Sequence, residues 1–397
     1  MPISEGLLAE DFARRIAGDL GVPDFVYHPQ PNVRTGSGSR ERGDGFLIAG
    51  SDGLILQVKH RDRAIGMRDT PARAKLWCEK YGLKAEEQGW GTRRLAKSSG
   101  LVVTSLRGYT RTLQTIDDWP IVVILDHPRN PSVTFGASPN TLFLSLTDWQ
   151  QLHSLVRSTA GLINYVRRAL TSGVKVPLGA ESGRYQNLAK ADAVYASPSP
   201  TMVPILPSRP LHPKDRRYAD LFDDLITKVA DPDGATGWDE EQYLWIVEHL
   251  DRTPVLVRAR LGAKMEQTFL SMIQHQARRS FFQMDRESGA RFAFLYDYDS
   301  GEPDGEYFPD GEFIAPKIAA YGALRQHQAL EAGCPPESAT LAVGVLHNPT
   351  RGRRYQFAFF QGAPPDLPED LRSQLQEEYG IFDGTTIRPP PPEVGAT

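Results

Sequence analysis

Apolar and polar residues alternate along the chain with two different periods, and together these predict an α/β protein. Short apolar runs have the length of buried strands, and longer stretches between them repeat with the helical period of about 3.6 residues. Over the first 175 residues the pattern predicts helices at 4–20, 71–98 and 147–170 and strands at 24–28, 44–49, 54–59, 121–125 and 141–146. Helices alternating with mostly buried strands indicate a mixed sheet flanked by helices.

Two of these helices have recognisable starts. Ser4 is a suitable N-cap for the first helix, in which Leu8, Phe12, Ile16 and Leu20 recur every four residues and are expected to form the buried stripe. The run from Thr147 to Gln150 fits a capping box for a helix that continues to about Leu170.

A proline-rich stretch divides the chain into two domains. Residues 179–214 are too dense in proline for a helix or a central strand and are expected to form a linker. A second α/β domain is expected over 215–384, and the tail 385–397 is expected to be disordered. The elements expected in the second domain are helices at 217–229, 239–250, 261–279 and 314–330 and strands at 291–298, 340–346 and 355–360. No motif in this domain indicates a function.

Composition narrows the class of protein. The chain has 397 residues, of which 40% are hydrophobic, so each domain can bury a core. Cys78 and Cys334 are its two cysteines and fall in different domains, which excludes a disulfide framework and a cysteine zinc site. No apolar run approaches the roughly 20 residues that cross a bilayer, and the N-terminal stretch is acidic, unlike a secretory signal. We expect a cytoplasmic protein without a membrane partner.

The most informative chemistry lies in a predicted hairpin. Two apolar runs, 46–49 and 54–58, flank a turn at 50–53, so Asp44 opens one strand while Gln57 and Lys59 close its partner. Side chains two apart on a strand share a face, and Gln57 and Lys59 therefore project together toward Asp44. A carboxylate, an amide oxygen and an ammonium would meet there. This set can hold a hard divalent cation and neutralise a phosphate oxygen.

The hairpin contains Asp44, then twelve intervening residues, then Gln57-Val58-Lys59. This pattern resembles the core motif of the PD-(D/E)xK, or restriction-endonuclease-like, nuclease superfamily. Gln57 stands where the commonest form of the motif has an acidic residue, and it matches the QxK form of Mrr-type restriction enzymes. The expected order of a helix, three antiparallel strands, a second helix and a further strand also resembles that core. The resemblance covers residues 1–178 only.

This resemblance implies a nuclease that hydrolyses phosphodiester bonds of DNA or RNA with Mg²⁺ or Mn²⁺. Asp44, the Val58 carbonyl and either Glu41 or Glu10 would bind the metal, Gln57 would orient the site, and Lys59 would position the attacking water. Glu5 lies nearer the apolar stripe of the first helix than Glu10 does, and Glu10 is preferred because its surroundings look more like the first helix of nuclease-like proteins. Restriction, antiviral defence and repair are the settings that the resemblance suggests.

The net charge of −4 is not that of a dedicated nucleic-acid-binding protein, so local clusters would have to supply phosphate contacts. DNA is the preferred substrate over RNA. The candidate phosphate-binding residues around and after the second helix are Arg93, Arg94, Lys97, Arg107 and Arg111.

Other readings of the same residues remain open. Asp44 could cap the loop that enters a strand, and Lys59 could belong to the charged end of an edge strand. The first domain could then be a catalytically inactive scaffold or nucleic-acid-binding module. A third alternative is an effector that is silent until a regulatory partner or second messenger engages the C-terminal domain. A homodimer is also open.

Overall fold

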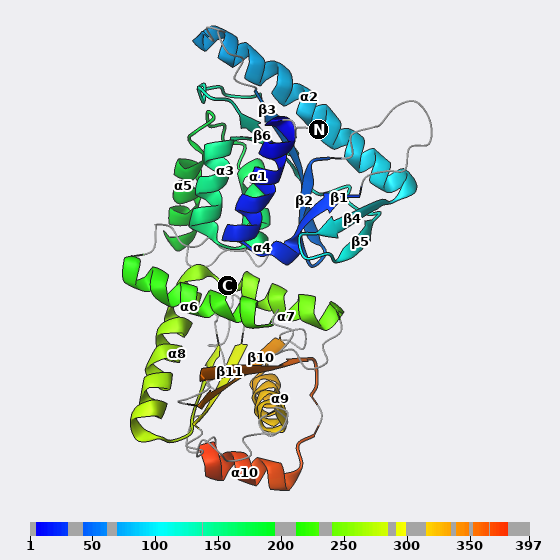
Figure 1. The fold of residues 1–397 in the computed structure, drawn as a ribbon. Coiled ribbons are helices and arrows are strands. Elements are labelled where there is room, and N and C mark those ends of the chain that lie inside the picture. The colour runs from blue at the N-terminus through cyan, green and yellow to red at the C-terminus, as the bar shows by residue number, and fades with distance from the viewer. Residues whose placement is uncertain are drawn as a thin grey trace, which may run out of the picture. The chain divides into compact units, whose positions relative to one another are not determined.

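The computed structural model describes residues 5–30, 43–61, 70–136, 138–194, 212–229, 240–284, 291–298, 315–334, 339–348, 352–364 and 366–379. The chain divides into two compact units, residues 1–210 and 211–397. Each unit is an α/β structure with its own sheet, as the sequence predicts (Figure 1). Ser4, residues 195–211 of the expected linker and the expected tail lie outside the described residues.

Unit 1 contains a seven-stranded mixed sheet with the strand order β5-β4-β1-β2-β3-β6-β7. Its strands are β1 (Val26–Pro29), β2 (Gly45–Ala49), β3 (Asp52–His60), β4 (Leu101–Ser105), β5 (Thr110–Leu113), β6 (Ile121–Asp126) and β7 (Thr141–Ser145). Its helices are α1 (Glu5–Leu20), the short 3-10 helix η1 (Pro23–Phe25), α2 (Pro71–Ser99), α3 (Leu146–Val156), α4 (Thr159–Thr171) and α5 (Glu181–Val194).

The central strands follow the expected order. β1, β2 and β3 form an antiparallel meander, and β6, which follows α2, β4 and β5 in the chain, pairs in parallel with β3. The hairpin β4–β5 extends the sheet beyond β1. These two strands were not predicted from the sequence. The helix from Pro71 is confirmed, with Thr70 as its N-cap.

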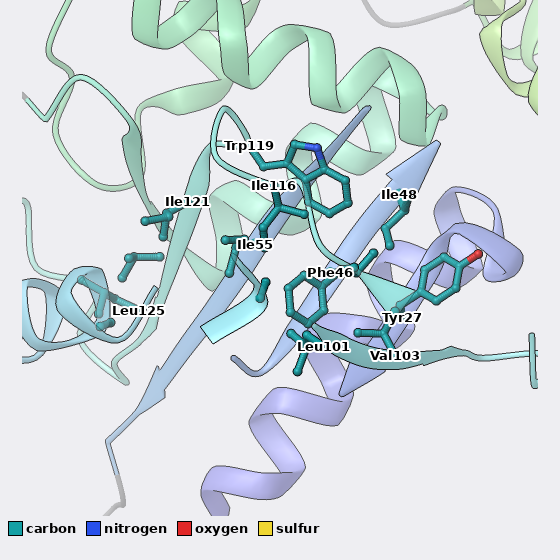
Figure 2. Close-up of a cluster of buried hydrophobic side chains, with 14 of the residues drawn as sticks. Tyr27, Phe46, Ile48, Ile55, Leu101, Val103, Ile116, Trp119, Ile121 and Leu125 are labelled. Atoms are coloured by element: carbon teal, nitrogen blue, oxygen red, sulfur yellow. The ribbon is translucent and has the colours of Figure 1, made fainter. Parts of the chain in front are cut away.

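α1 and α2 cover opposite faces of the sheet. Phe46 packs in one buried cluster with α2 residues, whereas a side chain at the next position, Gly45, would meet the stem of Arg14 on α1. Adjacent residues of a strand point to opposite faces, so the two helices lie on opposite sides. Figure 2 shows the α2-side cluster, in which Phe46, Ile55 and Ile121 from three neighbouring strands converge.

The buried stripe of α1 differs from the predicted one. Its buried positions include Ala9, Ala13 and Ile16, whereas Leu8 and Phe12 are 52% and 50% exposed. The prediction was wrong for these two residues because the helix carries apolar side chains on more than one face, and the smaller alanines allow closer packing against the sheet.

The junction after β7 also differs from expectation. Ser145, the last residue of β7, caps α3 directly: its hydroxyl accepts a hydrogen bond from the Asp148 N–H, and the Asp148 carboxylate accepts one from the Ser145 N–H. The predicted capping box at Thr147 is therefore wrong. The predicted single helix to Leu170 is two helices, because α3 ends at Val156 and Ser158 caps α4.

Helix α5 lies in the first part of the expected linker. Its first residue, Glu181, is buried, accepts a hydrogen bond from the Tyr165 hydroxyl on α4 and forms an ion pair with Arg184. Burial raises the pKa of the Glu181 carboxyl, and the neighbouring Arg184 opposes that shift. These contacts attach α5 to unit 1.

Unit 2 contains a four-stranded mixed sheet with the order β11-β10-β9-β8. Its strands are β8 (Arg279–Met284), β9 (Arg291–Tyr298), β10 (Ala339–Asn348) and β11 (Gly352–Gln361), and its helices are α6 (Pro213–Val229), α7 (Glu240–Arg252), α8 (Val255–His275), α9 (Ala315–Glu331) and α10 (Glu369–Tyr379). β9 and β10 are parallel, and the two outer pairs are antiparallel. β8 and α10 were not predicted from the sequence. Arg279, the first residue of β8, was expected to be the last residue of a helix. Among the described helices of both units, none has the length and apolar character of a membrane span.

Candidate active site

Asp44 stands immediately before β2 and is held against β3 by two hydrogen bonds. Its backbone N–H donates to the Leu56 carbonyl at 3.1 Å, and its carboxylate Oδ2 accepts the Val58 N–H at 2.6 Å. The β2–β3 ladder starts at the pair of Gly45 and Leu56, so the Asp44 side chain provides an acceptor for Val58 where backbone pairing has ended. Because the N–H and C=O of one strand residue point to the same side, the Val58 carbonyl is directed toward the Asp44 side of β3.

Lys59 joins Asp44 on the α2 face of the sheet. Its Nζ lies 3.9 Å from Asp44 Oδ2, and the two side chains are only 18% and 10% exposed. The hairpin therefore brings these two residues together as predicted. A separation of 3.9 Å is too long for a direct hydrogen bond, but it places a cation beside a largely buried carboxylate.

Gln57 lies opposite the start of β2 and is 1% exposed. A side chain at Gly43 would meet Gln57 Nε2 at 3.5 Å and the methyl group of Thr92 on α2 at 3.4 Å, which places the amide between the hairpin and that helix. Within the described part of the chain, Gln57 Nε2 has no hydrogen-bond partner. A buried polar atom without a partner is energetically costly, so this amide marks a position where a ligand could bind.

α1 approaches the hairpin at two points. Arg14 donates a hydrogen bond to the Asp44 carbonyl. Glu5 lies 3.4 Å from His60 Nε2, and His60 Nδ1 lies 2.7 Å from Asp126 Oδ2, so Glu5 is near the end of β3. Glu10 lies about one turn before Arg14 on α1. Because α1 covers the sheet face opposite to the one that Asp44 and Lys59 share, the role of Glu10 as a metal ligand stays a prediction. Glu41 lies outside the described residues.

The oxygen donors suit a hard cation held weakly. Asp44, the Val58 carbonyl and Glu10 are oxygen ligands of the kind that Mg²⁺ and Mn²⁺ take. Among the residues that the structure describes, no group of three or more His, Cys, Asp or Glu side chains is arranged to hold a metal. The residues present therefore fit a cation that keeps most of its waters, as Mg²⁺ commonly does, and do not form a dedicated protein cage.

Most of the predicted phosphate-binding cations are engaged within unit 1. Arg93 is 4% exposed and stacks over the Trp90 ring, and burial lowers the pKa of its guanidinium. Lys97 pairs with Asp117 at 3.1 Å and Arg107 with the buried Asp24 at 3.4 Å, while Arg111 donates to the Gly50 carbonyl. Arg94 is exposed. Arg93 is therefore buried, and phosphate binding by the five residues stays a prediction.

Three residues close to the site were not predicted as parts of it: Arg14, Thr92 and the His60 partner Asp126. Arg14 could have been found from its spacing of four residues after Glu10 on one helix face. Asp126 ends β6, and its partner across the parallel ladder is His60 on β3. Thr92 lies far from the hairpin in sequence, and no local signal places it there.

Comparisons with protein-family models, with curated proteins and with solved structures returned no match to this chain. The geometry of the site and its place in the sheet are therefore what support a function.

Proposed function

We propose that unit 1 is a nuclease that hydrolyses phosphodiester bonds with the help of Mg²⁺ or Mn²⁺. The observation that carries the proposal is the pairing of Asp44 and Lys59 across the β2–β3 hairpin, with the Val58 backbone directed to the same place. The surrounding arrangement supports it: an antiparallel meander is followed by a helix, and after the β4–β5 hairpin the chain returns as β6, which is parallel to β3. Apart from that hairpin, this is the order that the nuclease superfamily shares.

Each residue has a defined role in this proposal. The Asp44 carboxylate, the Val58 carbonyl and the Glu10 carboxylate would hold the cation, which when bound supplies Lewis-acid polarisation of the phosphate. Lys59 orients the attacking water and offsets the negative charge that develops on the pentacoordinate phosphate. Because Gln57 has a buried, unpaired amide N–H, it can donate to a phosphate oxygen and so fix the strand against the hairpin.

The direct test is cleavage of single- and double-stranded DNA and RNA by the full chain in Mg²⁺, in Mn²⁺ and in EDTA. We expect metal-dependent cutting, with DNA as the preferred substrate, and its loss on substitution of Asp44 or Lys59. Restriction, antiviral defence and repair are settings that such an activity would serve. Cleavage that persists in EDTA would contradict the proposal.

A second candidate, an inactive nuclease-like scaffold or nucleic-acid-binding module, is favoured by two observations. Asp44 already has a structural role as the acceptor for the Val58 N–H, and the described residues contain no three-residue acidic or imidazole metal cluster. An inactive module would bind nucleic acid with a steep salt dependence and would gain nothing from the cation. Affinity measured with and without Mg²⁺ separates the two candidates.

A further inference from the structure

Unit 2 contains a cleft of about 460 Å³ between its sheet and the helices α6 and α8. This volume lies in the range of pockets that hold small ligands, roughly 300 to 1,000 Å³. Its floor includes Tyr296 on β9, Val345 on β10 and Tyr355 on β11. Val345 pairs with Tyr296 on one side and with Tyr355 on the other, so the three side chains form one row on one face of the sheet. Met265 and Phe269 of α8 line the same cleft and are buried.

Charged residues of both signs line this cleft. α6 presents Asp220 and Asp224, one turn apart and both exposed, while β11 presents Arg353. The Arg353 guanidinium carbon lies 3.5 Å from the centre of the Phe269 ring, which places the cation over the apolar wall. Arg217 on α6 and Glu266 on α8, also in the lining, form an ion pair with each other. Apart from that pair, the lining has carboxylates on α6 and a guanidinium on β11.

Tyr296 supplies an independent sign of a missing ligand. Its side chain is 2% exposed, and none of the described residues forms a hydrogen bond with its hydroxyl. Burial raises the pKa of this phenol, with Tyr355 adding to the shift and Arg353 opposing it. The hydroxyl therefore stays protonated. It is a neutral donor in the floor of the cleft that a bound acceptor would satisfy.

We infer that this cleft binds a small zwitterion, an amino acid with an apolar side chain, whose ammonium group faces Asp220 and Asp224 and whose carboxylate meets Arg353 and the Tyr296 hydroxyl. The apolar side chain would pack on Val345 and Met265. A ligand that is only cationic would leave the Tyr296 hydroxyl without an acceptor, and one that is only anionic would face the α6 carboxylates. A bare metal ion is not favoured, because the described residues contain no cluster suited to one. This inference does not depend on the nuclease proposed for unit 1.

Binding to the full-length protein tests the inference. Each of the twenty standard amino acids is added at millimolar concentration, and its effect on the melting temperature and its heat of binding are measured. For any amino acid that binds, the amine lacking the carboxylate and the acid lacking the ammonium group are compared with it. We expect each analogue to bind at least about tenfold more weakly. Equal binding of either analogue, binding of mononucleotides in place of amino acids, or no binding by any amino acid would overturn the inference.

Substitution of Tyr296 by Phe distinguishes a ligand role from a structural one. Removing an unsatisfied buried hydroxyl should leave the melting temperature of the ligand-free protein unchanged or raise it, while weakening amino-acid binding about tenfold. Arg353→Gln and Asp224→Asn should weaken binding similarly, and Arg372→Gln, on the exposed surface of α10, is the control that should not. Unchanged affinity in Tyr296→Phe would overturn the assignment.

Discussion

The Lys59 ammonium lies 3.9 Å from the Asp44 carboxylate across the hairpin of β2 and β3, and both side chains are largely withdrawn from solvent. The register of the hairpin produces this relationship, because Gly45 pairs with Leu56 and the residues that follow the last pair on β3 therefore lie beside Asp44. The same carboxylate accepts the Val58 N–H. Asp44 is thus both a structural acceptor and the central acid of the proposed site, and substitutions can separate the two roles.

Replacement of Asp44 by Asn and by Ala should affect stability differently. Asn keeps an oxygen that can accept the Val58 N–H, whereas Ala leaves that N–H without its acceptor, which should cost about 1–3 kcal/mol in the free energy of unfolding. Cleavage should be lost in both variants, because neither carries a carboxylate. Chemical denaturation and a cleavage assay on the same preparations measure the two effects. Retained cleavage in Asp44→Asn would assign Asp44 a purely structural role.

Arg93 and Arg94 should respond in opposite ways although they are neighbours. Arg93 is buried over Trp90, and its Nε and Nη2 have no hydrogen-bond partner among the described residues. Arg93→Met should therefore leave the free energy of unfolding unchanged or raise it, and it should not alter nucleic-acid binding. Arg94 is exposed, and if it meets a phosphate, Arg94→Ala should reduce the slope of log affinity against log salt by about 0.9 for duplex DNA. Salt titrations of both variants check this. A reduced slope in Arg93→Met alone would refute the burial argument.

His153 should make unit 1 sensitive to acid. Complete burial lowers the pKa of its imidazole from 6.5 to about 3, and the ring packs edge-on against Trp149. Between those two pH values the unfolded chain binds a proton that the folded protein does not, so stability is lost as pH falls, by up to about 1.4 kcal/mol per pH unit. His153→Leu should remove this part of the pH dependence. Urea denaturation from pH 7 to pH 4 on both proteins tests it, and parallel curves would contradict it.

Gly262 should be indispensable where α6 and α8 cross. A Cβ at this position would lie 1.9 Å from the Tyr218 carbonyl oxygen, which is backbone and cannot rotate away. Gly262→Ala should therefore force the helices apart and destabilise unit 2 by about 1–3 kcal/mol. Gly183→Ala on α5 is the matched control, because a Cβ there meets nothing within 4 Å, and alanine's higher helix propensity should stabilise by up to about 1 kcal/mol. Equal melting temperatures for the two variants would contradict the close approach of α6 and α8 at Gly262.

The sequence predicts the hairpin site well and the surroundings less well, for physical reasons. Strand period, a turn and three polar residues are local signals, and they suffice to bring Asp44 and Lys59 together. The buried face of α1 was misjudged because Leu8 and Phe12 are apolar but exposed, and hydrophobicity alone does not decide between two apolar faces. The junction at Ser145 was missed because β7 runs into α3 without a loop.

Long-range contacts account for the remaining differences. α5 has a weak amphipathic pattern and is attached by the buried Glu181, whose partners Tyr165 and Asp148 come from other helices. Arg93 is buried by the packing of α2, whereas its neighbour Arg94 is exposed. Two adjacent arginines look alike in the sequence, so their charge does not predict which one is buried. Helical period and charge are properties of a segment, whereas burial depends on the elements that pack against it.

The most direct test of the proposed function is the rate of DNA cleavage in Mn²⁺ by the wild type, Lys59→Ala and Lys264→Ala. Lys264 is an exposed lysine on α8 of unit 2, and it is the matched control for removing one lysine. The proposal predicts metal-dependent cleavage by the wild type, a loss of about 100-fold or more in Lys59→Ala and little change in Lys264→Ala, with all three proteins folded. Equal cleavage by the wild type and Lys59→Ala would contradict it.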